Sequence, residues 1–323
     1  MALIPNNQVH ANQINAGITG RKKGHKFENL LTQELNRLTT IDYNIVKDKH
    51  LYIGNPALIL MAFIEKKFNL KIKNYKAYWL GGLATSGTGD EVYTENGEKV
   101  KKSKSDVLVE LNLRDGTQKI IGVSVKTCSK KTPTNDQMFF TTANAFCNLL
   151  ERNSIIVTED ARKGMEMFCG DIGFRPIDLL DKSQLAKRLS DKNRFYWEEI
   201  PQKAFADWGY IFTYHQNEIT RILFQKAYSD DPFYPEILLH QTVQYNDLNN
   251  CSIAIYTMDE IINCSHSYSG FTYSKYRIKK GSNKNDPNEH LAPRFGFIQF
   301  QRGGQKQHPT QLQFNLKSGY FNI

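Results

Sequence analysis

Two runs of alternating apolar residues, joined through an Asp-Gly dipeptide, constrain the fold of this chain more than any other feature. The first run has apolar side chains at every second position, at Val107, Val109, Leu111 and Leu113. The second repeats the pattern at Ile121, Val123 and Val125. A period of two is typical of β-strands with one buried face, and Asp115-Gly116 is typical of a turn between them. We therefore expect an antiparallel hairpin over residues 105-127.

The polar residues of this hairpin can act together only if they share a face. Ser124 and Lys126 do so, because strand side chains alternate. Asp106 joins them if the loop has an odd number of residues, and a three-residue loop centred on Gly116 would place it opposite Lys126. A two-residue turn would instead direct Asp106 to the other face. A joint function of the three residues therefore requires an odd loop.

An aspartate and a lysine on one face can carry out metal-assisted chemistry on a phosphate. Asp106 can bind Mg²⁺ together with waters and a phosphate oxygen, and Lys126 can position a water or help to deprotonate it. The backbone carbonyl of Val125 is a further candidate ligand, while the neutral Ser124 would act through a water. Glu28, on an expected helix upstream, adds an acid that can reach a metal through a water. The alternative is a solvated strand face, which is the commoner role of such residues.

The charge of the chain bears on its partner. A formal net charge of +9 favours a polyanion, although a basic soluble enzyme explains the charge alone equally well. Basic residues cluster in four runs, at residues 20–26, 101–105, 126–131 and 276–284. Each run lies beside an expected turn or element end, where phosphate contacts are usually made.

Helices are expected mainly in the first two thirds of the chain. Leucines at helical spacing predict a helix over residues 26–38, and Asn55 followed by Pro56 is a typical helix start. Further helices are expected over residues 137–151 and from residue 201 to about residue 230.

The last third of the chain is β-rich. Strands are expected within residues 236–245, 251–258, 295–302 and 310–316. Together with the hairpin they predict an α/β (α+β) fold, a mixed central β-sheet flanked by helices. We expect a core at 1-195 and a region at 196-323, comprising a long helix and β-rich segments, packed with the core as one domain.

Several classes of protein are disfavoured. The apolar run Ala57–Phe63 is too short to span a bilayer, and the N-terminus lacks a signal-peptide pattern. The five cysteines form no CxxC pair, which argues against a zinc site and a disulfide framework. The eight histidines show no metal-binding spacing. We expect a cytoplasmic protein without a membrane partner.

The polar residues of the hairpin resemble those of a known family. Asp106, then Ser124-Val125-Lys126 and the basic residues after them, resemble the catalytic core of PD-(D/E)xK nucleases. More narrowly, they resemble MspI and its relatives, small Type IIP restriction endonucleases. Other segments match in the same order, at residues 24–35, 79–87, 103–131, 200–214 and 292–316. Together the segments cover about half of the chain.

The resemblance implies Mg²⁺-dependent hydrolysis of duplex DNA, with Mn²⁺ able to substitute, at a short C+G-rich palindromic site, leaving 5′-phosphate ends. Asp106 matches the metal-binding Asp, Lys126 the catalytic Lys and Glu28 the first-helix Glu. Ser124 departs from the family, which has an acid or an amide there. The segment 88–102 looks longer than in relatives, and whether its Asp90 or Glu91 supplies a replacement carboxylate stays open.

The resemblance also implies partners. Such a restriction enzyme has a methyltransferase as its genetic partner, and it acts as a monomer or a homodimer. Long polar side chains in the C-terminal segment are candidates to read double-stranded DNA, with arginine matched to guanine and amides to adenine. These candidates are Arg294, Gln299, Gln301, Arg302, Gln305 and Lys306. Candidates for phosphate or base contacts elsewhere are Ser129, Lys130, Lys131, Arg21, Lys22 and Lys23.

Two other functions remain open from the sequence. One is a nuclease of the same fold that acts in DNA repair or on modified DNA. The other, suggested by Ser124, is a DNA-binding protein on a catalytically degenerate nuclease fold.

Overall fold

The computed structural model describes residues 8–47, 49–83, 87–128, 137–226, 231–242, 247–268, 270–279, 283–302 and 310–316. The chain divides into two compact units, each assembled from separate stretches. The six-stranded unit comprises Ile14–Asn135, Phe224–Ile262 and Ser318–Ile323. The five-stranded unit comprises Met1–Gln13, Asp136–Leu223 and Asn263–Lys317. The division expected between residues 195 and 196 falls inside the five-stranded unit.

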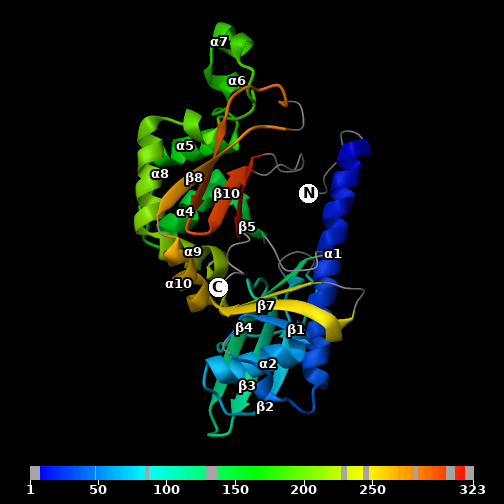
Figure 1. The fold of residues 1–323 in the computed structure, drawn as a ribbon. Helices are drawn as coiled ribbons and strands as arrows, with labels where there is room; N and C mark the ends of the chain where they lie inside the picture. Colours follow the sequence, from blue (N-terminus) through cyan, green and yellow to red (C-terminus); the bar gives the residue numbers. More distant parts are fainter. Residues whose placement is uncertain are drawn as a thin grey trace. The chain divides into compact units, whose positions relative to one another are not determined.

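The six-stranded unit is built on a mixed sheet with strand order β1-β7-β6-β4-β3-β2 (Figure 1). Only the β4–β6 pair is parallel among these strands. The strands are β1 Leu51–Gly54, β2 Ile72–Trp79, β3 Val107–Leu113, β4 Gln118–Cys128, β6 Pro235–Thr242 and β7 Cys251–Thr257. Helices α1 (Gln8–Arg37) and α2 (Pro56–Lys67) contribute to the apolar core on one face. The expected mixed sheet flanked by helices is confirmed.

The two helices show what apolar periodicity detects. Helix α2 begins as predicted, because the Asn55 side chain accepts a hydrogen bond from the Ala57 N–H and Pro56 occupies the first turn. Helix α1 begins well before the predicted residue 26. Leu31 and Leu35 in its later part are fully buried, whereas residues 17–23 are exposed, so the apolar pattern marked a packed part of the helix and missed this exposed stretch.

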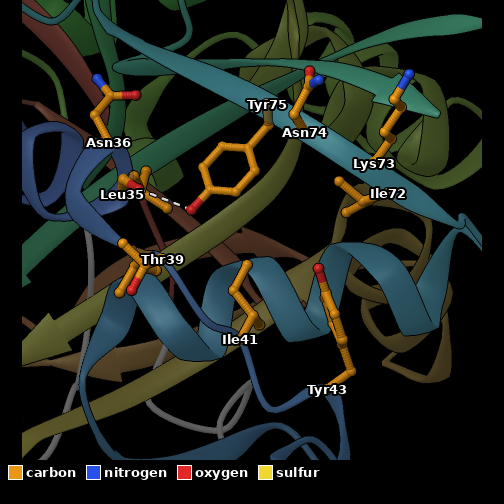
Figure 2. A pocket seen from close by; sticks show the side chains of 10 residues that line it. Leu35, Asn36, Thr39, Ile41, Tyr43, Ile72, Lys73, Asn74 and Tyr75 are labelled. Carbon is orange, nitrogen blue, oxygen red and sulfur yellow. Dashed lines mark hydrogen bonds between the residues drawn. The ribbon is translucent and has the colours of Figure 1, made fainter. Parts of the chain in front are cut away.

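The end of α1 is fastened to β2. The Asn36 side chain donates to the Ala77 carbonyl and accepts from the Ala77 N–H, at 2.9 and 2.8 Å. The Tyr75 hydroxyl donates to the Leu35 carbonyl at 2.8 Å, and both residues line a pocket of about 270 Å³ (Figure 2). Burial raises the pKa of Tyr75 to about 12, so this donor keeps its proton. These bonds fix the register of α1, and with it the position of Glu28, against the sheet.

The hairpin of β3 and β4 forms with an odd loop. Val107 pairs with Val123, and the pairing ends at a hydrogen bond from the Leu113 N–H to the Thr117 carbonyl. Gly116 takes the left-handed conformation in this three-residue loop, with φ of +89°. Asp106, one residue before β3, is therefore level with Ser124. The predicted opposition to Lys126 was wrong by two residues, because the loop is centred on Asp115, whereas the predicted sharing of one face is confirmed.

The five-stranded unit holds an antiparallel sheet with order β5-β11-β10-β9-β8. Its strands are β5 Gln137–Thr142, β8 Phe271–Tyr276, β9 His290–Phe295, β10 Ile298–Arg302 and β11 Gln311–Leu316. Helices α4 (Ala143–Arg152), α5 (Glu159–Cys169) and α8 (Gln202–Tyr214) supply aromatic partners to one face of this sheet (Figure 1).

Sequence expectations in this unit needed correction. The helix predicted over 137–151 is strand β5 followed by α4, because Thr142 ends the strand and its hydroxyl caps the helix at the Ala145 N–H. The long helix predicted from residue 201 is two helices, α8 and α9 (Gln216–Gln225), divided at His215. The single strand predicted over 295–302 is the end of β9 and all of β10, and β8 was not predicted.

The remaining elements are short. They are η1 Tyr43–Ile45, α6 Pro176–Leu179, α7 Lys182–Lys187, η2 Trp197–Glu199, η3 Leu248–Asn250 and α10 Met258–Ser267. In the described ranges no helix is both long and apolar enough to cross a membrane. All five cysteines are free thiols.

Candidate active site

Asp106 is held rigidly at the point where β3 begins. Its N–H donates to the Val123 carbonyl at 2.9 Å, and its own carbonyl accepts from the N–H groups of Leu80 and Gly81. Its Oδ2 accepts from the Val125 N–H at 2.7 Å and from the Ser124 hydroxyl at 3.3 Å. Among the described residues, Oδ1 has no hydrogen-bond partner. The carboxylate is therefore oriented through Oδ2, whereas Oδ1 is not engaged by the described residues.

Lys126 faces the same carboxylate. Its Nζ lies 3.6 Å from Asp106 Oδ2, and the two side chains are 24% and 19% exposed. The hairpin thus brings together the two residues that the sequence singled out. Because both side chains keep some contact with solvent, the pair can reach a bound substrate.

Glu28 lies beside this pair in a crowded place. The side chain is 7% exposed, and the Trp79 indole N–H donates to its Oε2 at 3.3 Å. Gly81 allows this approach, because a Cβ at that position would overlap with the same oxygen. Burial first, and then the negative charge of Asp106, raise the pKa of Glu28 to about 8, against the smaller opposing effects of Trp79 and Lys126. In the protein alone, Glu28 therefore holds a proton at neutral pH.

His240 is a neighbour that the sequence patterns did not indicate. It pairs with Lys126 across the parallel strands β4 and β6, and it is 1% exposed. Burial, together with the positive charge of Lys126, lowers the pKa of His240 to about 3. The imidazole is neutral near physiological pH and adds no positive charge beside the lysine.

The oxygen atoms of the site are of the kind that Mg²⁺ prefers. Asp106 and Glu28 supply carboxylates, and a Mg²⁺ site in an enzyme of nucleic acids often uses one or two carboxylates with waters and substrate phosphates. Within the described ranges, no group of three or more His, Cys, Asp or Glu side chains is arranged to hold a metal ion. Ser124 is 2% exposed and donates to Asp106, so it supplies no charge of its own.

Asp90 and Glu91, in the segment before β3, both make contacts with other residues of the same unit. The Asp90 carboxylate accepts from the Trp79 N–H at 2.7 Å, and the Asp90 N–H donates to the Trp79 carbonyl at 2.8 Å. Glu91 forms an ion pair with Lys99 on an exposed turn. Asp90 thus fixes the end of β2, and through Trp79 it supports the position of Glu28.

The candidate DNA-binding residues fall into different settings. Arg21, Lys22 and Lys23 are exposed on α1. Arg294 and Gln299 are directly opposite each other on β9 and β10, and Gln301 is exposed on β10. Ser129, Lys130, Lys131, Gln305 and Lys306 lie outside the described residues.

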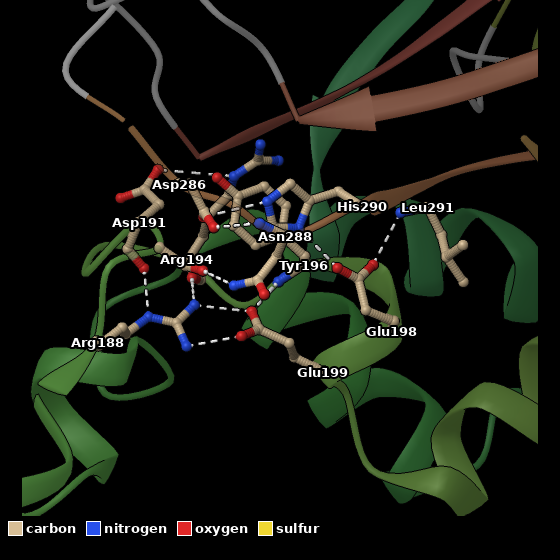
Figure 3. A network of polar contacts seen from close by, with 11 residues as sticks. Arg188, Asp191, Arg194, Tyr196, Glu198, Glu199, Asp286, Asn288, His290 and Leu291 are labelled. Atoms are coloured by element: carbon tan, nitrogen blue, oxygen red, sulfur yellow. Dashed lines mark hydrogen bonds and ion pairs between the residues drawn. The ribbon is translucent and has the colours of Figure 1, made fainter. Parts of the chain in front are cut away.

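Arg302 is placed apart from the other candidates. Its guanidinium contacts Asp191 at 3.2 Å, and its side chain is 12% exposed. Asp191 belongs to a polar network in which Arg188 binds Glu199, and His290 lies between Glu198 and Asp286 (Figure 3). The setting of Arg302 is that of a structural ion pair.

Three residues of the site were missed by sequence reasoning, namely Trp79, Gly81 and His240. Their roles depend on contacts between distant segments, so no spacing in the sequence could assign them. The Gly-Gly pair at positions 81 and 82 was the one available signal, since glycine often marks a close approach of backbone to another group.

A buried amide next to the site leads to a stability prediction. Gln241 on β6 is fully buried beside Thr127 and Ile253, and among the residues that the structure describes neither end of its amide has a hydrogen-bond partner. An unsatisfied buried polar group costs about 1–3 kcal/mol. We expect Gln241→Met, which keeps the shape of the side chain, to raise the free energy of unfolding by about that amount. A urea titration measures this, and a loss of stability in the variant would contradict it.

Comparisons with known proteins point to a similarity in structure. No protein-family model matches the chain, and no curated protein matches it. Among solved structures, the chain is similar to a crystal structure of restriction endonuclease MspI in complex with its cognate DNA. The sequence identity is 12%, the TM-score is 0.45, and the match covers 80% of this chain and 78% of that chain.

Proposed function

We propose that this protein is a Type II restriction endonuclease of the PD-(D/E)xK kind, which uses Mg²⁺ to hydrolyse duplex DNA at a short, C+G-rich palindromic site. The observation that carries the proposal is the pairing of Asp106 and Lys126 at 3.6 Å on one face of the hairpin. The three hydrogen bonds of the Asp106 backbone and the two to its side chain hold this geometry before any substrate arrives. Such preorganisation is what catalysis of phosphate chemistry requires.

The residues have separate roles in the proposal. Asp106 Oδ1, the Val125 carbonyl and, through a water, Glu28 would hold the ion. When bound, Mg²⁺ supplies positive charge to a phosphate oxygen and lowers the pKa of an attacking water. Lys126 positions that water and stabilises negative charge that develops on the phosphate. Ser124 contributes by orienting Asp106.

His240 and Trp79 support these groups without touching the substrate. The neutral His240 beside Lys126 leaves the lysine as the cation at that point of the sheet. Trp79 and Gly81 hold the Glu28 carboxyl group close to Asp106. We therefore treat His240, Trp79 and Gly81 as positioning residues.

The proposal extends to partners and location. A cytoplasmic methyltransferase that modifies the same site would protect the host DNA, as a genetic rather than a physical partner. A palindromic site has two-fold symmetry, and either a homodimer or a monomer acting on one strand at a time can cut it. The net charge of +9 favours the approach to DNA.

Digestion of plasmids of known sequence tests the proposal. With Mg²⁺ or Mn²⁺ we expect discrete fragments, with 5′-phosphate ends that map to one short sequence, and no cleavage in EDTA. Smears, or cuts only in modified or structured DNA, would favour the repair or modification-dependent nuclease. Binding without any cleavage would favour the catalytically degenerate DNA-binding protein that Ser124 suggests.

A further inference from the structure

Polar side chains form a continuous row across the five-stranded sheet. Thr272 is paired with Arg294, Arg294 with Gln299, Gln299 with Asn315, and Asn315 with Gln137. Three of the pairs are directly opposite in regular register, whereas Asn315 meets Gln137 after a register shift between Phe314 and Asn315, so the line of residues ends at an irregular strand edge. We call this set the polar row, and it consists of Gln137, Asn315, Gln299, Arg294 and Thr272. Neighbouring strands are about 4.8 Å apart, so the row extends over about 19 Å.

The polar row lies on the face of the sheet away from the aromatic core. Phe295, Phe300 and Phe314 alternate with its members along β9, β10 and β11, and all three are fully buried. Phe212 of α8 packs on Phe295 at a ring distance of 4.7 Å, and Phe146 of α4 packs on Phe314 at 4.7 Å. The helices of this unit that pack on these rings therefore cover the other face (Figure 1).

The members of the polar row are accessible and share a surface. Gln137 and Thr272 are exposed, and the three central members are partly exposed. The Arg294 Nε donates to the Thr272 hydroxyl at 3.2 Å, which confirms that the two side chains point to the same face. Gln301, one row further along β10, adds an exposed amide to that face.

The chemistry of the polar row suits contact with DNA. It has three amides, one guanidinium and one hydroxyl, and no carboxylate that would repel a phosphate. An amide both donates and accepts hydrogen bonds, so it can match the edge of a base pair. Arginine is matched to guanine, which every G·C pair of a C+G-rich site contains. Strands can enter a DNA groove, as other β-sheet readers show.

We propose that the polar row is the base-reading surface of this protein, with Gln299 and Asn315 on the central strands contacting base edges and Arg294 beside them contacting guanine. This inference rests on the proposed function and specifies how its site is recognised. It adds Gln137, Asn315 and Thr272 to the DNA-contacting residues. It removes Arg302, which alternates with Gln301 along β10 and contacts Asp191 on the aromatic side.

Sequence preference in binding tests the proposal separately from cleavage. The full-length protein is mixed with duplexes that carry a randomised central segment, in Ca²⁺, which takes the same oxygen ligands as Mg²⁺. The bound fraction is sequenced for wild type, Gln299→Ala and Asn315→Ala. Gln202→Ala is the matched control, because Gln202 is exposed at the start of α8 in the same unit and off the sheet.

We expect wild type and Gln202→Ala to enrich one sequence. Gln299→Ala and Asn315→Ala should lose about 5- to 150-fold of the discrimination at the base pairs they contact, while binding of the random pool is unchanged. Gln299→Glu should weaken binding of all duplexes, because it places a carboxylate within the row, and it keeps the test valid if an alanine variant folds poorly.

The outcomes separate the two proposals. If both alanine variants enrich the wild-type sequence to the wild-type extent, the polar row does not read DNA. If wild type cuts plasmids but enriches no sequence, the proposal of base reading by the polar row is contradicted and the proposed nuclease activity is supported. A third outcome is that wild type enriches one sequence, with a weaker preference in the alanine variants, and yet never cuts DNA with Mg²⁺ or Mn²⁺. That result would support the polar row as the base-reading surface and contradict the proposed nuclease activity.

Discussion

Replacing Lys126 with methionine is expected to lower the rate of DNA cleavage by about 10²- to 10⁴-fold, the usual contribution of one catalytic group. Methionine keeps an unbranched side chain of similar length but removes the ammonium group that lies 3.6 Å from Asp106. Binding should persist, because the contacts that hold the hairpin do not involve this side chain. Single-turnover cleavage at saturating DNA, together with anisotropy of labelled DNA in Ca²⁺, measures both properties.

Lys119→Met is the matched control for this change. Lys119 lies on the same strand, next to the hairpin loop, and its ammonium group sits over the Phe68 ring. The control removes the same charge away from Asp106, so cleavage should stay near the wild-type rate. Equal losses in both variants would mean that net charge alone matters, and wild-type cleavage by Lys126→Met would remove this lysine from the mechanism.

Glu28 is expected to make the protein less stable as pH rises. Its pKa is about 8 in the folded protein, against the ordinary value of 4.5 for a glutamate. Between these values the folded state binds more protons than the unfolded state, so stability is full below about pH 4.5 and falls as pH rises through 8. The shift corresponds to on the order of 5 kcal/mol as an upper limit. In EDTA, Glu28→Gln should lose this dependence and be the more stable form at high pH.

Thermal unfolding of wild type and Glu28→Gln from pH 5 to 9 measures this difference in stability. The other titrating groups are the same in both proteins, so their effects cancel when the two profiles are subtracted. Glu95→Gln is the control, because it removes a carboxylate from an exposed turn and should keep the wild-type profile. Parallel pH profiles for wild type and Glu28→Gln would show that Glu28 is ionised throughout this range. Burial and the charge of Asp106 would then not raise the pKa of Glu28.

Local patterns predicted the parts of the fold that depend on local interactions. Asn55 and Pro56 marked the start of α2 because capping involves only adjacent residues. The alternation of apolar and polar residues marked β3 and β4. The odd number of residues in the loop placed Asp106 and Lys126 on one face. The register itself escaped prediction by two residues, since an odd loop can be centred on Asp115 or on Gly116, and only its hydrogen bonds decide between them.

Features that depend on distant segments could not be predicted. The composition of the residues after Gln137 is compatible with either a helix or a strand. They form a strand up to Thr142 because they pair with β11. The polar row exists only because four separate pairings align residues from five strands. The contacts of Trp79 and Gly81 with Glu28, and the pairing of His240 with Lys126, likewise join segments that are far apart in sequence.

Cleavage by Asp106→Asn tests the central claim most directly. Asparagine keeps an oxygen that can accept from the Val125 N–H, so the local structure of the hairpin should be retained, whereas Asp106→Ala would also lose that bond. We measure cleavage of a plasmid that wild type cuts, with Mg²⁺ and with Mn²⁺, alongside the unfolding temperature. We expect the variant to unfold at the wild-type temperature and to show no cleavage. Cleavage at the wild-type rate would contradict it.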